Sequence, residues 1–165
     1  MAGASLDGGD LGLGEAGEEA VLVARVPANR SMSIVLSVGS RLPAYPTSMG
    51  RVLLAALPEA ELRRYLASAR LDPLTARTIT DPAALWRELE WVRGQGYALV
   101  DGEREEGVRS VGAPVRDARG AVIAAINVSA NAGRVSVAEL RGRCVPLVVE
   151  TALAISRDIG FVASE

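Results

Sequence analysis

The chain has 165 residues, and 18 basic against 20 acidic side chains give it a net charge of −2. It contains no His and one Cys, which excludes Ser-His-Asp catalysis, Cys-His catalysis and a His/Cys metal site within one chain. The charge argues against a nucleic-acid surface, which usually shows a basic excess. No apolar run has membrane-spanning length and no signal peptide is recognisable. We therefore expect a cytoplasmic domain without membrane contact, and a lone Cys suits that reducing compartment.

The first part of the chain divides into two regions. Residues 1–19 are rich in Gly, Asp and Glu and lack hydrophobic periodicity, so we expect a flexible N-terminal segment followed by one domain over residues 20–165. An apolar, β-rich run covers residues 20–26, and an alternating run covers residues 32–38. The turn between these runs predicts an antiparallel hairpin with one buried face.

A stiff loop followed by an apolar helix is predicted between residues 42 and 57. Pro43 and Pro46 disfavour a helix before Thr47, whose side chain is a good N-cap. Apolar residues at helical spacing follow, and Gly50 has no side chain to cover the unpaired N–H groups of the first turn. Two interpretations stay open here: an ordinary capped core helix, or a helix N-terminus that binds an anion.

The remaining pattern predicts further helices and strands. Pro58 begins a short second helix, Asp81 caps a third that ends near Gly96, and Ser136 with Glu139 forms a capping box for the last. Pro146 should kink that last helix. Strands are expected at residues 97–100, 108–115 and 121–129. This order indicates an α+β fold, with an antiparallel sheet covered by helices.

Polar residues interrupt the apolar strands. Asn127 and Ser129 lie two residues apart and so share one face, where they either bond to nearby backbone or face a ligand. Asp101 suits a turn, and Ser110 suits a solvent-facing strand position. The acidic residues of the 101–107 loop lack the regular spacing of a calcium loop, so we expect a solvated loop and no metal.

Three charged or reactive side chains have structural as well as functional interpretations. Arg51 and Arg109 either clamp a ligand carboxylate or pair with a structural acid, which is the commoner role. Cys144 lies among apolar residues of the last helix, where core packing is expected rather than reactivity.

Five collinear stretches resemble one family. "RLPAYPTSMGRVLLA" is similar to the start of the effector-binding domain of IclR-family transcription regulators. The "TARTITD" linker, the "VRGQGYALVDGEREEGVRSVGAPVRD" stretch, the "GAVIAAINVSANAGRVS" strand and the closing helix to Ile159 follow in the same order. The resemblance implies a GAF-like antiparallel sheet of about six strands flanked by helices. It also implies that no cofactor is bound and that the protein is not an enzyme.

The resemblance further implies what the domain binds. The winged helix-turn-helix domain of the family is not legible in this chain, so DNA contact would belong to an absent N-terminal domain. Homodimers that pair into tetramers are expected. The effector would be a small organic acid, and the first motif is most similar to the branch that controls aromatic-acid catabolism, including protocatechuate and β-ketoadipate pathways. The implied effector-binding residues are Ser48, Met49, Gly50, Asp101, Ser110, Asn127 and Ser129.

The sequence departs from the family pattern at three positions in or beside these motifs. Pro46 stands where a Cys is usual, Asn127 where Ser is commonest, and Gly102 where a Gln is often found. Two other functions stay open: a partner without DNA-binding helices that modulates full-length relatives, and a small enzyme that uses carboxylates and Arg.

Overall fold

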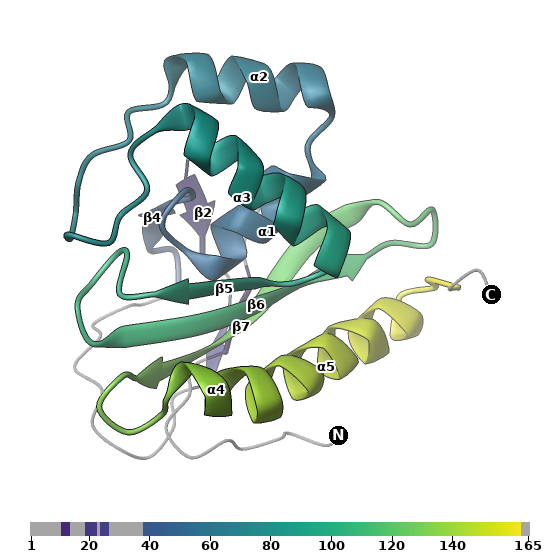
Figure 1. The fold of residues 1–165 in the computed structure, drawn as a ribbon. Coiled ribbons are helices and arrows are strands. Elements are labelled where there is room, and N and C mark those ends of the chain that lie inside the picture. The colour runs from purple at the N-terminus through teal and green to yellow at the C-terminus, as the bar shows by residue number, and fades with distance from the viewer. Residues whose placement is uncertain (1–10, 14–18, 23, 27–37, 163–165) are drawn as a thin grey trace.

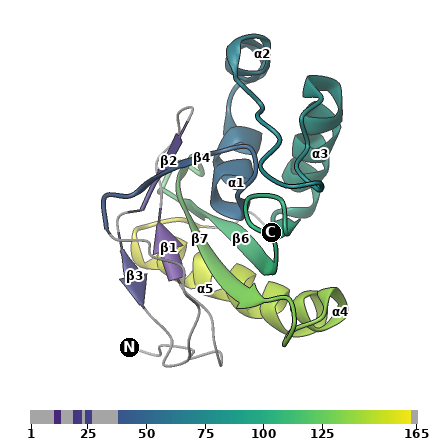
Figure 2. The same cartoon turned by 90° about the vertical axis from the view of Figure 1, so that its left-hand side faces the viewer.

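The computed structural model describes residues 11–13, 19–22, 24–26 and 38–162. Helices lie on both sides of an antiparallel sheet, as the views in Figure 1 and Figure 2 show. One side carries the helices of the middle of the chain, and the other side carries the C-terminal helix. The α+β class expected from the sequence is therefore confirmed. In chain order the helices are α1 (Ser48–Ala56), α2 (Glu59–Ser68), α3 (Pro82–Gln95), α4 (Val137–Glu139) and α5 (Val145–Asp158).

The strands form a sheet of five and a separate pair. The order in the large sheet is β3-β1-β7-β6-β5, and β2 pairs with β4. The described sheet is thus one strand smaller than the six or so expected. The strands are β1 (Leu11–Leu13), β2 (Glu19–Val21), β3 (Arg25–Val26), β4 (Arg41–Pro43), β5 (Ala98–Asp101), β6 (Val108–Arg116) and β7 (Val122–Asn131).

The N-terminal part differs from the expected hairpin. Residues 20–26 do not form one strand: β2 pairs with β4, whereas β3 pairs with β1. The proposed second strand over residues 32–38 falls almost entirely outside the described residues. β1 lies within the segment expected to be flexible, yet it is hydrogen-bonded to β7. Three residues were too few to show a periodicity in the sequence, and the flexibility of the rest of residues 1–19 stays a prediction.

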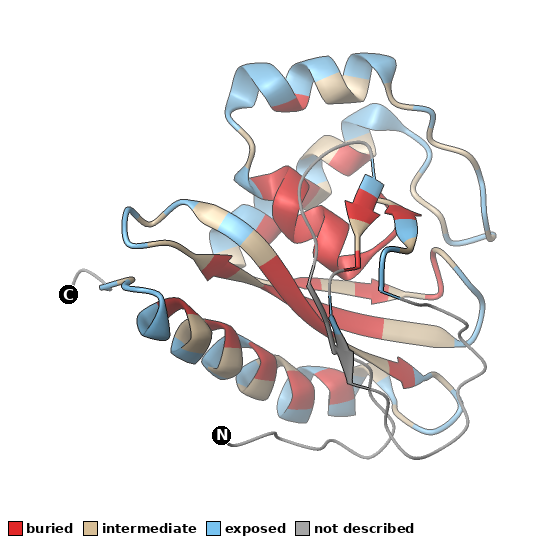
Figure 3. Ribbon diagram, turned by 180° about the vertical axis from the view of Figure 1, so that it is seen from behind, coloured by how far each residue is buried: buried red, intermediate tan, exposed pale blue. Residues whose placement is uncertain are grey.

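Helix α1 is the most deeply buried element, as Figure 3 shows. Its residues Ser48 to Ala55 are all buried, and it packs with α3 in one core cluster. A second cluster lies between β6, β7 and α5 on the other side of the sheet. The sheet is therefore covered twice, which explains why β7 is apolar along most of its length.

The C-terminal helix changes its hydrogen bonding near Pro146. The capping box of Ser136 and Glu139 begins it as expected. A π-helical turn over Leu140–Cys144 then precedes α5, and Val145 donates its N–H to Leu140. Proline has no N–H for the carbonyl four residues earlier, and a wider turn lies just before it; the kink itself stays a prediction. Within the described part of the chain, no helix is long and apolar enough to cross a membrane.

Candidate functional site

The first turn of α1 is fixed by a side-chain cap. Thr47 accepts the Gly50 N–H at 3.1 Å through its hydroxyl oxygen and donates to the Ala44 carbonyl at 3.1 Å. The backbone of Thr47 is extended, as an N-cap requires. The predicted cap is therefore confirmed, and it occupies one of the N–H groups that a ligand was expected to use.

Ser48 and Met49 retain unused donors. Their backbone N–H groups have no partner among the residues that the structure describes. The Ser48 side chain is 1% exposed, and its Oγ is the one fully buried side-chain N or O atom, among those described, without a hydrogen bond. A buried hydroxyl without a partner costs about 1–3 kcal/mol. The fold keeps this buried, unpaired hydroxyl although it is destabilising, which is typical of a functional position.

The polar strand residues lie on the face of the sheet that α1 covers. A Cβ placed on Gly112 would lie 2.9 Å from the Ser48 carbonyl carbon and 3.2 Å from the Met49 nitrogen, so this peptide rests directly on β6. Gly112 is paired with Asn127, and Ser110 is paired with Ser129. Since alternate residues share a face, Ser110, Asn127 and Ser129 all lie on the α1 side.

These polar side chains are partly or fully buried. Ser110 and Asn127 are each 9% exposed, so neither occupies a solvent-facing strand position. The Asn127 amide donates to the Ser129 hydroxyl at 3.1 Å. The shared face predicted from their two-residue spacing is thus confirmed, and Ser110 joins them from the neighbouring strand.

Asp101 is not brought together with the other expected residues. It is paired with Arg109 at the end of β5, and its neighbour Val100 is paired with Ser110. Asp101 therefore lies on the opposite face of the sheet from Ser110. Its carboxylate accepts from Arg109 at 2.5 Å and also from Arg77. The Arg109 guanidinium additionally donates to the carbonyls of Ala132 and Val135, and its pairing with Asp101 is the structural role weighed for it above.

Gly50 is also placed differently from expectation. A Cβ on Gly50 would overlap the backbone of Ala44, so this glycine is required by close packing against the entry loop. Its N–H is used by Thr47. The lack of a side chain therefore serves the fold and does not open the helix end to a ligand.

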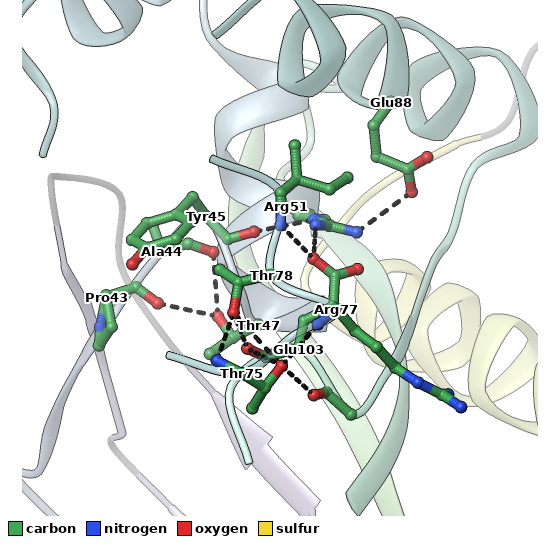
Figure 4. A network of polar contacts seen from close by, with 12 residues as sticks. Pro43, Ala44, Tyr45, Thr47, Arg51, Thr75, Arg77, Thr78, Glu88 and Glu103 are labelled. Atoms are coloured by element: carbon green, nitrogen blue, oxygen red, sulfur yellow. Dashed lines mark hydrogen bonds and ion pairs between the residues drawn. The ribbon is translucent and has the colours of Figure 1, made fainter. Parts of the chain in front are cut away.

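A buried ion-pair network holds α1 in position, and Figure 4 shows its members. The Arg51 side chain is 1% exposed and donates to the Tyr45 carbonyl at 2.8 Å. It also pairs with Glu103 at 2.5 Å and with Glu88 of α3 at 3.3 Å. Glu103 belongs to the loop expected to be solvated, and this expectation is wrong for it, although Glu105 and Glu106 are exposed.

The linker before α3 closes around the same loop (Figure 4). The Thr75 hydroxyl donates to the Gly102 carbonyl at 2.7 Å, and the Thr78 hydroxyl donates to the Glu103 carbonyl at 2.6 Å. The Ile79 N–H donates to the Glu103 carboxylate at 3.3 Å. The "TARTITD" stretch therefore fixes Glu103, which in turn fixes Arg51 and the first turns of α1.

Two positioning residues were missed in the sequence. Gly112 carried a usable signal, because a glycine inside a strand often marks a close approach of another backbone. Glu103 carried none, since its neighbours in the loop are also acidic and only the fold buries it. Among the described residues, no group of three His, Cys, Asp or Glu side chains is arranged to hold a metal.

Known proteins are similar to this chain in sequence and in fold. Residues 11–157 match the family model described as bacterial transcriptional regulator IclR C-terminal. The chain is 47% identical to the Pca regulon regulatory protein of Pseudomonas putida over 144 residues, which is 87% of this chain and 48% of that protein. The chain thus spans about half the length of this curated relative.

Solved structures agree with the sequence match. The Thermotoga maritima IclR structure has a TM-score of 0.86 at 34% identity, covering 93% of this chain and 62% of that one. The inducer-binding domain of an Acinetobacter PobR double mutant, in complex with 3-hydroxybenzoic acid, has a TM-score of 0.82 at 34% identity, covering 89% and 87%. The chain therefore belongs to the IclR family of bacterial transcriptional regulators, and it corresponds to their C-terminal domain.

Proposed function

We propose that this chain is an effector-binding domain that holds a small organic acid between the first turn of α1 and the polar face of β6 and β7. The observation that carries the proposal is the buried Ser48 hydroxyl without a partner. A ligand oxygen placed beside it would accept this hydrogen bond and remove the cost of leaving the hydroxyl unpaired. The unused N–H groups of Ser48 and Met49 offer further donors at the same helix end.

The donors of this site suit an anion. Helix N-termini favour negative charge by about 0.3–1 kcal/mol, and by more where they are partly buried. Ser110, Asn127 and Ser129 add hydroxyl and amide groups that either donate or accept. Asp101 is excluded from the proposed site because it lies on the other face of the sheet and is paired with Arg109. The ligand contacts we propose are therefore those of Ser48, Met49, Ser110, Asn127 and Ser129.

Related proteins suggest the class of acid. The PobR domain was solved with 3-hydroxybenzoic acid, and the Pseudomonas putida relative is named for the Pca regulon. We propose an aromatic hydroxy acid, whose carboxylate meets the α1 N-terminus and whose hydroxyl meets the β6 and β7 side chains. In the whole regulator, a DNA-binding domain before this one would read the operator, in the cytoplasm and as a dimer or tetramer.

The test is calorimetric titration with 3-hydroxybenzoate, 3,4-dihydroxybenzoate and their neutral amides. The acids should bind more tightly than the amides, because the amides lack the charge that the helix end favours. Equal or tighter binding of the amides would refute the helix-end mechanism. Binding of none of these compounds would refute the aromatic-acid assignment.

Two variants locate the site. Ser48→Ala should weaken acid binding roughly 10- to 150-fold, since a hydrogen bond to a charged group is worth about 1.5–3 kcal/mol. The same variant should leave the free protein as stable or more stable, because it removes an unpaired buried hydroxyl. Asn127→Ala should weaken binding without unfolding the domain. Ser68→Ala, at an exposed position of α2, is the control and should change neither property.

A further inference from the structure

Two cavities lie at the end of the molecule away from the first turn of α1. This is the end where the β6–β7 turn and the C-terminal ends of α3 and α5 come together, at the right of Figure 1. One cavity, of about 260 Å³, lies between α1, α3 and the β6–β7 strands; the other, of about 180 Å³, lies between β6 and α5. Both are lined by Gly96, Pro114 and Arg116.

The larger cavity has walls that are about half apolar and half polar. Small and branched aliphatic side chains form most of its lining, with Val52 and Ala55 from α1, Val92 from α3 and Val122 from β7. An engineered apolar cavity of about 150 Å³ in another protein holds a benzene molecule. The volume here is therefore enough for one aromatic ring or a short aliphatic chain.

Arg116 places a positive charge at this cavity. Its side chain is half-buried, and its Nη1 donates to the Gly120 carbonyl at 3.0 Å. No carboxylate of the described residues lies within ion-pair distance of it. The adjacent Asp117 is used by Arg119, whose Nη2 lies 2.9 Å from the Asp117 carboxylate. The Arg119 side chain also holds the Asp117 pKa below its usual value, so this acid stays ionised and committed to Arg119.

The carbonyl groups at the helix ends around the cavity are already hydrogen-bonded, so they do not draw another cation to the cavity. The C-terminal carbonyls of a helix carry partial negative charge when they are unpaired. Here Arg93 donates to the carbonyls of Ala55 and Leu57, at 2.8 and 3.2 Å. The Gly96 N–H caps the Val92 carbonyl at 2.9 Å. Arg93 also lines the cavity, but it is paired with Glu90 at 3.1 Å, so among the described residues Arg116 is the lining guanidinium without an ion pair.

We propose that this cavity is a second ligand site, for a compact monocarboxylate. The apolar body of the ligand fills the space between α1 and α3, and its carboxylate pairs with Arg116. Guanidinium groups bind carboxylates through two parallel hydrogen bonds, and Arg116 has donors to spare. Along α1 the cavity is lined by Val52, Ala55 and Ala56, which follow Ser48 by four to eight residues, or roughly 6–12 Å along the helix axis.

The test is a titration of the isotope-labelled chain with benzoate, followed by amide chemical shifts in NMR. Benzoate should shift the Gly96, Gly120 and Ala121 resonances in a saturable manner, and benzamide should shift them only weakly. Arg116→Gln should reduce this affinity about tenfold or more. Arg119→Gln removes the same charge from an exposed, paired side chain and should leave the affinity unchanged. Ala56→Leu, which fills the exposed rim of the cavity, should also weaken binding.

Several outcomes would overturn the proposal. These are unshifted amides at the cavity, equal shifts with benzamide, or an affinity that Arg116→Gln leaves unchanged. Shifts of the same amides with protein concentration alone would show that a second copy of the chain covers this end, which would also overturn it. Ser48→Ala distinguishes the two sites, because it should weaken binding at the α1 N-terminus and leave the benzoate shifts at Gly96 intact.

Discussion

Removal of the Arg51 side chain should destabilise the domain more than removal of an exposed charged side chain does. Arg51 is 1% exposed and donates to one carbonyl and two carboxylates, so Arg51→Ala leaves Glu103 buried without its cation. Removing one partner of a buried ion pair typically costs about 3–5 kcal/mol. For a domain of this size, each kcal/mol lowers the Tm by about 2–4 °C, so the expected loss is about 6–20 °C.

The measurement is urea unfolding followed by circular dichroism, with thermal scans in parallel. Glu103→Gln keeps an acceptor for the guanidinium and should cost less than Arg51→Ala. The double variant Arg51→Ala with Glu103→Gln should cost less than the sum of the two, because the pair interacts directly. Arg70→Ala is the matched control, since that Arg is 87% exposed, and it should cost at most about 1 kcal/mol. If Arg51→Ala costs no more than this control, the network does not position α1 as we infer.

Two further predictions concern local structure. Gly50→Ala should destabilise the domain by more than the roughly 1–3 kcal/mol of ordinary overpacking, because the new Cβ meets the Ala44 backbone. Gly94→Ala has open space around the new Cβ, so it should raise the Tm through the better helix propensity of Ala. Thermal scans of both variants check this, and equal effects would contradict it. The backbone N–H and hydroxyl of Ser136 lower the pKa of Glu139. A lowered pKa gives stability above the unfolded value, which is lost as pH falls through the folded value. Ser136→Ala should therefore reduce the loss of Tm on acidification, and an unchanged pH dependence would refute the capping argument.

The network around Arg51 links the fold to the proposed effector site. Arg51 lies one turn after the unused donors of Ser48 and Met49, and Glu103 is itself held by the Thr75–Ile79 linker. A shift of this linker would therefore move the first turn of α1. The "TARTITD" linker has few apolar residues, but these contacts give it a structural role beside the α1 entry loop.

Much of the secondary structure could be predicted from the sequence, because it depends on local interactions. Prolines and caps act within a few residues, so the start of α1 at Thr47, the Asp81 cap of α3 and the capping box at Ser136 were all predictable. The two-residue period of a strand likewise placed Asn127 and Ser129 on one face. The assignment to a family followed from collinear motifs and needed no coordinates.

Only the tertiary structure decided which of these residues meet. Strand register is a non-local property, and it placed Ser110 beside Ser129 while it turned Asp101 to the other face. β2 pairs with β4 and β1 pairs with β7. These segments are far apart in the sequence, so local patterns do not show which strand pairs with which. Burial made the same distinction among charges: Glu103 and Arg51 neutralise each other inside the fold, while similar residues nearby stay in solvent. Sequence patterns fix what a residue favours locally, and long-range packing fixes what it contacts.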